Sequence, residues 1–255
     1  MAGLDVTHLT YVEIEREIAR LPAIIVPLGG CEPYAQFGAL GVTLAVAEAV
    51  SRELSQRMNM LVAPTLAFGN STAFMSFGGS AGIKPRTLTN ALCETIRMWF
   101  FQGIRTVVIV DALLDNREAV ETAQKRLATS HPGYNVIVVA LQRDGRIADF
   151  IKTALPGSEL YRAEFGMLSM AAWIDPGLVR DAKETAQKPL ISDVARFKHW
   201  RKRGSDPEQF RKFAANCSCS AAAQAYTAEF GKKLFEFIVS LAEETVTRAI
   251  QTRLG

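Results

Sequence analysis

The stretch Ala23-Ile-Ile-Val-Pro-Leu-Gly-Gly-Cys-Glu32 determines how the chain folds around its candidate site. Its first residues form an apolar run, which indicates a buried strand, and Gly29 and Gly30 allow the backbone to turn tightly after it. Cys31 and Glu32 are thereby placed at the carboxyl end of that strand, where ligands bind in open α/β sheets. The stretch therefore predicts a ligand site at this edge of the sheet.

Strand patterns alternate with helical patterns over the first 150 residues, and the latter part is mostly helical. We expect strands over Ala23–Leu28, Leu61–Pro64, Thr106–Asp111 and Tyr134–Leu141. We expect helices over Thr10–Leu21, Thr43–Met58, Thr87–Phe101, from a cap at Asp115 or Asn116 to Ala128, and over Ser220–Arg253. This order predicts one domain over residues 1–255, with a three-layer α/β/α fold and a mostly parallel central sheet.

The composition bounds the class of protein. The chain has 255 residues, of which 49% are hydrophobic and 22% charged, values typical of a globular enzyme. A net charge of +3 is too mild to indicate nucleic acid or a membrane surface as partner. We see neither a signal-peptide pattern nor an apolar run of membrane-spanning length, so we expect a cytoplasmic protein. Four cysteines without a CxxC pair predict neither a zinc site nor a disulfide framework.

A zinc hydrolase normally needs imidazole ligands, and this chain offers few. None of its three histidines follows a predicted core strand: His8, His131 and His199. The polar residues near Glu32 in sequence are instead Tyr34, Gln36 and Thr43. The predicted site therefore has a carboxylate but lacks the usual helpers of a metal centre.

Four segments carry a resemblance to a known family. They are Pro27–Ala39 (PLGGCEPYAQFGA), Phe68–Ser80 (FGNSTAFMSFGGS), Val110–Asn116 (VDALLDN) and Ala225–Phe235 (AYTAEFGKKLF). In their order along the chain and in part of their residues, these segments resemble the motifs of the creatininase family. Members of that family are metal-dependent amidohydrolases that open cyclic amides or cleave related C–N bonds. The resemblance implies a creatininase-like fold and a ring-shaped homo-oligomer, commonly a hexamer.

Most of the family's metal ligands are replaced in this sequence. Glu32 matches the first carboxylate ligand, whereas Tyr34 stands where a histidine belongs and Thr43 where an aspartate belongs. Leu113 replaces a second histidine, and Asp115 can stand for an acidic ligand. A phenol with a pKa of about 10 is a poor zinc ligand at neutral pH, and leucine has no lone pair. We therefore expect a degenerate metal site that holds no metal, or at most one divalent ion through Glu32 and Asp115.

We assign the catalytic roles to Glu32, Tyr34 and Asp115. Residues expected to contact a small-molecule substrate are Cys31, Ser71, Phe74 and Asn116. Alternatives remain open for several of them. Glu32 and Asp115 could only cap turns, Cys31 could be a nucleophile or a small packing residue, and Phe74 could line an apolar pocket or close one. Glu164 is a weaker acidic candidate.

Three further features have two interpretations each. The basic run Arg196–Arg203 could bind an acidic partner or form a solvated helix face. The pair Cys217 and Cys219 is more typical of packing at a helix start than of a redox or zinc site. The apolar residues Trp99, Phe100 and Phe101 could supply an oligomer interface.

Three functions follow in order of preference. The first is a divergent creatininase-like enzyme acting on a small cyclic or amide-containing metabolite through acid–base chemistry. The second is a non-catalytic relative that binds a ligand or assembles with an active paralogue. The third is an ordinary two-metal amidohydrolase.

Overall fold

A parallel sheet forms the centre of the computed structural model, which describes residues 4–154, 162–181, 206–214, 217 and 225–251. Within these ranges the sheet has four strands in the order β2-β1-β3-β4. The strands are β1 (Ala23–Leu28), β2 (Leu61–Val62), β3 (Thr106–Asp111) and β4 (Asn135–Ala140). All neighbouring pairs are parallel, so their carboxyl ends meet at one edge. All four segments expected as strands are thereby confirmed as strands.

Helices separate the strands and make up most of the latter part. Their bounds are α1 (Tyr11–Arg20), α2 (Val42–Met58), α3 (Pro85–Phe101), α4 (Arg117–Ser130), α5 (Gly145–Ala154), α6 (Arg162–Ile174), α9 (Pro207–Phe213) and α10 (Ala228–Gln251). Short 3₁₀ turns are η1 (Val6–His8), η2 (Thr72–Phe74), η3 (Leu114–Asn116) and η4 (Pro176–Leu178). No helix in the described part of the chain is long and apolar enough to cross a membrane.

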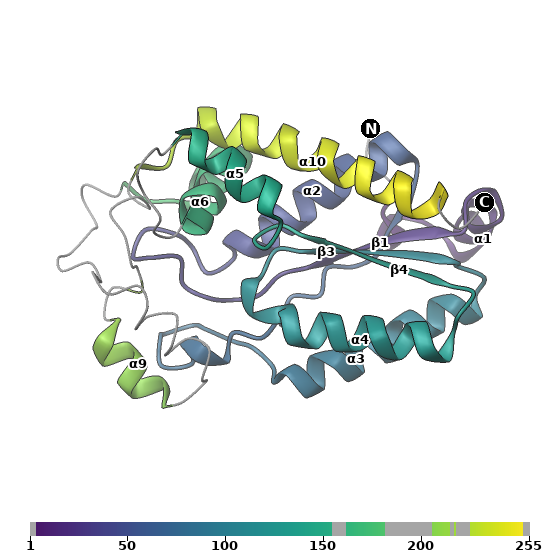
Figure 1. Cartoon of the computed structure of the whole chain (residues 1–255), viewed down its shortest axis with the longest axis horizontal. Coiled ribbons are helices and arrows are strands. Elements are labelled where there is room, and N and C mark those ends of the chain that lie inside the picture. The colour runs from purple at the N-terminus through teal and green to yellow at the C-terminus, as the bar shows by residue number, and fades with distance from the viewer. Residues whose placement is uncertain (1–3, 155–161, 182–205, 215–216, 218–224, 252–255) are drawn as a thin grey trace.

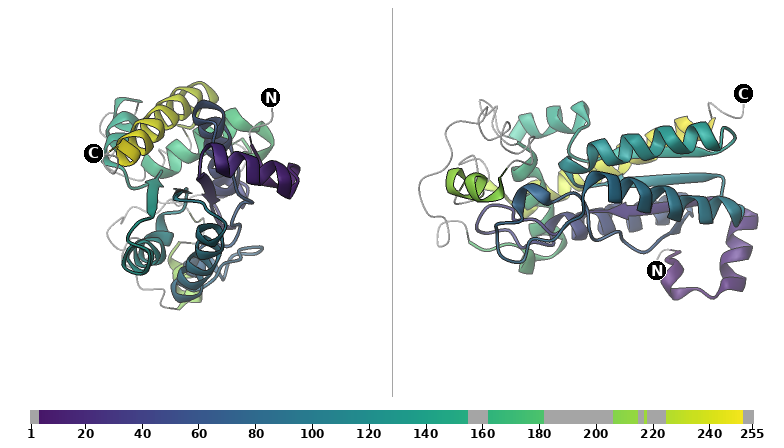
Figure 2. Two further views of the ribbon diagram at one scale, coloured as in Figure 1. Left: turned by 90° about the vertical axis from the view of Figure 1, so that its right-hand side faces the viewer. Right: turned by 90° about the horizontal axis from the view of Figure 1, so that it is seen from below.

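The helices cover both faces of the sheet. Helices α2, α6 and α10 lie over one face, and α3 and α4 run side by side over the other (Figures 1 and 2). Alternate strand residues enter the two cores, because side chains alternate across a strand. Val108 and Val110 pack with the first helix layer, whereas Val107 and Ile109 pack with the second. The three-layer α/β/α prediction is therefore confirmed.

Some element boundaries differ from the predictions. Strand β2 ends at Val62 rather than Pro64, because proline lacks the N–H that a strand ladder needs. Helix α10 begins at Ala228 rather than Ser220, and residues 218–224 lie outside the described ranges. Phe100 is 3% exposed and belongs to the core, so it cannot serve an interface, while Phe101 is 90% exposed.

Helix α1 begins with a capping box. The Glu13 N–H donates to Thr10 Oγ1 (3.4 Å), and the Thr10 N–H donates to Glu13 Oε2 (2.7 Å). We expect Thr10→Ala to lower the free energy of unfolding by about 1 kcal/mol, since the Glu13 N–H loses its side-chain acceptor. Urea unfolding measures the change. Thr129→Ala, late in α4, is the control and should stay within about 0.5 kcal/mol; equal effects would contradict the cap.

Candidate functional site

The turn after β1 packs tightly against two other segments. A Cβ atom on Gly29 would lie 2.9 Å from the backbone of Leu44, and one on Gly30 would lie 2.8 Å from Leu113 Cδ2. The Thr43 hydroxyl closes the turn, because it accepts from the Gly30 N–H (3.0 Å) and donates to the Gly30 carbonyl (2.9 Å). The two glycines are therefore needed for close approach, and Thr43 is committed to the backbone.

Glu32 and Tyr34 follow this turn in the protein interior, with exposed fractions of 1% and 4%. The Tyr34 hydroxyl accepts a hydrogen bond from Gln142 Nε2 (2.7 Å). The same Gln142 nitrogen donates to the Ala112 carbonyl (2.5 Å), just beyond β3. Gln142 lies in the turn after β4, so one amide links the first motif to the carboxyl ends of two strands.

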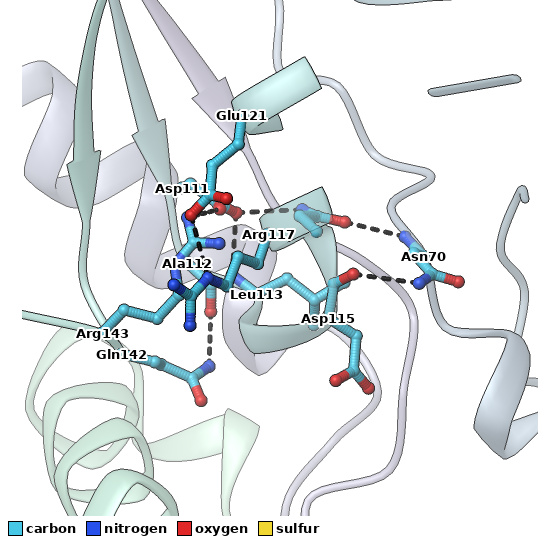
Figure 3. A network of polar contacts seen from close by, with 10 residues as sticks. Asn70, Asp111, Ala112, Leu113, Asp115, Arg117, Glu121, Gln142 and Arg143 are labelled. Carbon is cyan, nitrogen blue, oxygen red and sulfur yellow. Dashed lines mark hydrogen bonds and ion pairs between the residues drawn. The ribbon is translucent and has the colours of Figure 1, made fainter. Parts of the chain in front are cut away.

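Asp111, the last residue of β3, is the centre of a buried polar network (Figure 3). Its carboxylate accepts from Arg143 Nη2 (2.6 Å), from Asn116 Nδ2 (2.9 Å) and from the Leu113 N–H (3.2 Å). Burial raises the pKa of Asp111 to about 6, while Arg143 and the other donors act in the opposite direction. The Asp111 carboxyl is therefore paired with Arg143, but it lies in a buried environment that disfavours its negative charge.

Asn116 extends this network to the second motif. Its Oδ1 accepts from the Asn70 N–H (2.8 Å), and Asn70 Nδ2 donates to the Asp115 carbonyl (2.9 Å). The Asp115 carboxylate points away from Asp111 (Figure 3). Asn116 occupies the N-cap position of α4 but makes no side-chain cap bond there. Of the two residues expected to cap this helix, Asn116 does not do so with its side chain, because its amide binds Asp111 and Asn70 instead.

The second motif contributes two buried residues, of which Ser71 lies beside the turn after β1. Ser71 is 2% exposed, and its Oγ would lie 2.9 Å from a Cβ on Gly30. Phe74, also 2% exposed, contacts the rings of Phe77 and Phe210, with centroids 6.2 and 5.6 Å apart. Because Phe210 belongs to α9, this aromatic cluster holds α9 against η2. The substrate-binding roles of Ser71 and Phe74 stay predictions.

The remaining candidates occupy separate places. Cys31 is partly exposed, and its carbonyl accepts from the Ala81 N–H (3.1 Å). Glu164 is 7% exposed in the first turn of α6. Cys217 is buried, in agreement with a packing role. The basic run Arg196–Arg203 lies outside the described residues, as do Cys219 and His199.

Among the described residues, Thr43 and Leu113 do not match the ligands that the family resemblance implies at their positions. Both hydrogen-bonding functions of Thr43 are used by Gly30. Leu113 is 1% exposed and packs between two turns, since Cβ atoms on Gly30 and Gly69 would lie 2.8 and 2.7 Å from its Cδ2. Within the described ranges, no group of three or more His, Cys, Asp or Glu side chains is arranged to hold a metal ion.

Two of the predicted site residues form hydrogen-bonded sets with residues that the sequence did not single out. Tyr34 and Asn116 belong to hydrogen-bonded sets completed by Asp111, Gln142 and Arg143. A signal for them does exist in the sequence. Asp111 is the charged end of an apolar strand, and Gln142 and Arg143 come just after the next strand, so parallel pairing brings them to the same edge.

Sequence comparison identifies similar proteins. A family profile described as creatinine amidohydrolase matches residues 7–246. A creatinine amidohydrolase of Pseudomonas putida is 24% identical over 171 residues, which are 63% of this chain and 64% of that protein. The matched part is thus slightly less than two thirds of that relative's length.

Several solved structures share the fold. A tryptophan-to-phenylalanine variant of a type II creatininase has a TM-score of 0.74 at 19% identity, covering 97% of this chain and 99% of that one. A manganese form of creatininase has a TM-score of 0.72 at 19% identity, with coverage of 97% and 99%. A structure described as a putative creatinine amidohydrolase from Bacteroides fragilis has a TM-score of 0.66 at 17% identity, with coverage of 96% and 97%. These likenesses support a common architecture from end to end.

Proposed function

This chain belongs to the creatininase family, and from this membership we propose that it is a divergent relative acting on a small cyclic or amide-containing metabolite. The reaction is C–N bond hydrolysis through acid–base chemistry of protein side chains. At most one divalent ion takes part, with Glu32 and Asp115 as its oxygen donors. The main support is the replacement of two ligand positions: the Thr43 hydroxyl is hydrogen-bonded to both backbone groups of Gly30, and the Leu113 side chain has no lone pair.

The proposed chemistry uses residues of the first and third motifs. Glu32 or Asp115 takes a proton from water as the water oxygen attacks the carbonyl carbon of the amide. Tyr34 donates a hydrogen bond to the carbonyl oxygen, on which negative charge develops. The proton then passes to the leaving nitrogen as the C–N bond breaks. Low exposure of Glu32 and Tyr34 strengthens both interactions, because water screens them little.

A second function is favoured by the packing of Leu113. This side chain fills the space between the turns at Gly30 and Gly69, so part of the site is occupied by the protein itself. A non-catalytic relative that binds a ligand, or that assembles with an active paralogue, would have this feature. We expect a cytoplasmic homo-oligomer under the first proposal. Co-purification with a second creatininase-like protein, together with no turnover alone, would favour the second.

We expect Glu32→Gln or Asp115→Asn to lower kcat by about 100-fold, since one of these carboxylates serves as the base. Turnover is measured with creatinine first and then with other small cyclic amides, and zinc and manganese are quantified per subunit. Glu118→Gln changes an exposed carboxylate of α4 and should leave turnover unchanged. Full turnover in both site variants would refute the acid–base proposal. Near-stoichiometric metal would support the ordinary two-metal mechanism instead.

A further inference from the structure

The side chain of Gln142 makes two hydrogen bonds from one nitrogen. Nε2 lies 2.7 Å from Tyr34 Oη and 2.5 Å from the Ala112 carbonyl oxygen. Tyr34 is 108 positions away in sequence and Ala112 is 30. This residue was not among the candidates from sequence, and the proposed chemistry gives it no role. Its contacts nevertheless place it directly on the proposed proton donor.

The Ala112 carbonyl fixes which end of the Gln142 amide faces Tyr34. A carbonyl oxygen only accepts hydrogen bonds, so the group 2.5 Å away must be the NH₂ and not the amide oxygen. Reversing the amide would bring two acceptors together in a site where Ala112 is fully buried. The amide orientation follows from chemistry, and Gln142 is a donor toward Tyr34.

The direction of the Tyr34 hydroxyl follows in turn. Its oxygen accepts from Gln142, so its own hydrogen must be donated to an acceptor other than Gln142. We propose that Gln142 is a positioning residue that holds Tyr34 as a hydrogen-bond donor toward the carbonyl oxygen of a bound amide. This inference rests on the proposed function and deepens it, because it selects ligands that present an acceptor, such as a lactam or imide oxygen, to Tyr34.

The neighbouring residue supports the rigidity that this role requires. Arg143 pairs with the Asp111 carboxylate at 2.6 Å, so Gln142 and Arg143 bind consecutive residues at the end of β3. The Asp111 side chain is fully buried, and that of Arg143 is 14% exposed. The Ala112 carbonyl is therefore held in place from both strands, which fixes the amide of Gln142 in front of Tyr34.

Two variants of Gln142 separate direction from packing. Gln142→Leu removes the hydrogen-bond donor and keeps a side chain of similar size. Gln142→Glu also keeps the size, but at pH 8 it offers a carboxylate acceptor. The Tyr34 hydroxyl would then donate its hydrogen to position 142. We expect both to lower kcat by about 100-fold with KM changed less than about threefold. In a Tyr34→Phe background, Gln142→Leu should have no further effect, because the two residues act as a unit. The control is Gln124→Leu, since Gln124 donates to the Val136 carbonyl (2.7 Å) away from the site.

A spectroscopic measurement tests the contact without any substrate. Tyrosine labelled with ¹³C at Cζ gives five signals at most, and Tyr34→Phe identifies the one of Tyr34. We expect this signal to shift in Gln142→Leu and to remain in place in Gln124→Leu. An unshifted Tyr34 signal, or wild-type kcat in Gln142→Glu, would overturn the positioning role. If the signal shifts but no cyclic amide is turned over by the wild type, the contact stands and the proposed function fails.

Discussion

Gly231→Ala is expected to lower the free energy of unfolding by about 4 kcal/mol, or to prevent folding altogether. Gly231 lies in the first turn of α10, where that helix crosses α6. A Cβ atom there would lie 1.9 Å from the Ser169 carbonyl oxygen and 2.3 Å from its carbonyl carbon. Both atoms are backbone and cannot move aside as a flexible side chain could, so the helices must separate.

The separation would disturb a large part of the first core. Helix α10 buries Leu234, Ile238 and Val239 against the layer that α2 and α6 also form. The Thr227 N–H donates to Ser169 Oγ (3.2 Å) at the same crossing, and this bond would be lost as well. Steric overlap at one backbone atom therefore affects many apolar contacts, which explains why the expected effect exceeds that of an ordinary substitution.

Urea unfolding of the purified variant measures the loss, and a second glycine supplies the control. Gly145 is the first residue of α5, and a Cβ atom there would meet no atom within 4 Å. Gly145→Ala should change the free energy of unfolding by less than about 0.5 kcal/mol. If Gly231→Ala behaved like Gly145→Ala, the close crossing of α6 and α10 would be wrong.

The strands at the centre of the sheet could be predicted from the sequence almost to the residue. β1 and β3 are apolar runs buried on both faces, so their composition alone marks them. Boundaries were less predictable where tertiary contacts decide them. Helix α10 has an apolar stripe that continues the pattern expected from Ser220, yet the helix begins only at Ala228. Periodicity indicates which face is buried but not where the first turn forms.

The position of the candidate site could be predicted from the sequence, but only some of its contacts could. Glu32 and Tyr34 follow β1, as the Gly-rich turn indicated. Gln142 is 108 positions from Tyr34, and Arg143 is 32 positions from Asp111, so sequence spacing could not identify these two partners. These contacts depend on the pairing register of β3 and β4, which cannot be deduced from the sequence alone.

Arg143→Met is expected to lower the free energy of unfolding by about 3–5 kcal/mol at pH 8. The Asp111 side chain has an exposed fraction of 0%, and Arg143 is its charged partner at 2.6 Å. Removing one member of a buried ion pair leaves the other charge without compensation. Asp111→Asn combined with Arg143→Met should recover much of the loss, because a neutral amide replaces the stranded carboxylate.

A surface pair nearby provides the control for this substitution. Arg146 binds Asp144 at 2.7 Å, but the two side chains are 49% and 26% exposed. Water and salt screen such a pair, so Arg146→Met should cost less than about 1 kcal/mol. Equal losses in Arg143→Met and Arg146→Met would mean that burial of Asp111 is unimportant.

The pH dependence of the Arg143→Met effect identifies Asp111 as its cause. Burial raises the folded-state pKa of Asp111 from 3.8 to about 6, so the folded protein binds this proton more tightly than the unfolded chain. The resulting stabilisation is complete below pH 3.8 and is lost as the pH rises through 6, with a total of about 3 kcal/mol. Without Arg143 the pKa of Asp111 rises further, because the guanidinium no longer favours the carboxylate. The loss in free energy of unfolding caused by Arg143→Met should therefore be large at pH 8 and smaller at pH 5. An equal loss at both pH values would exclude Asp111 as its origin.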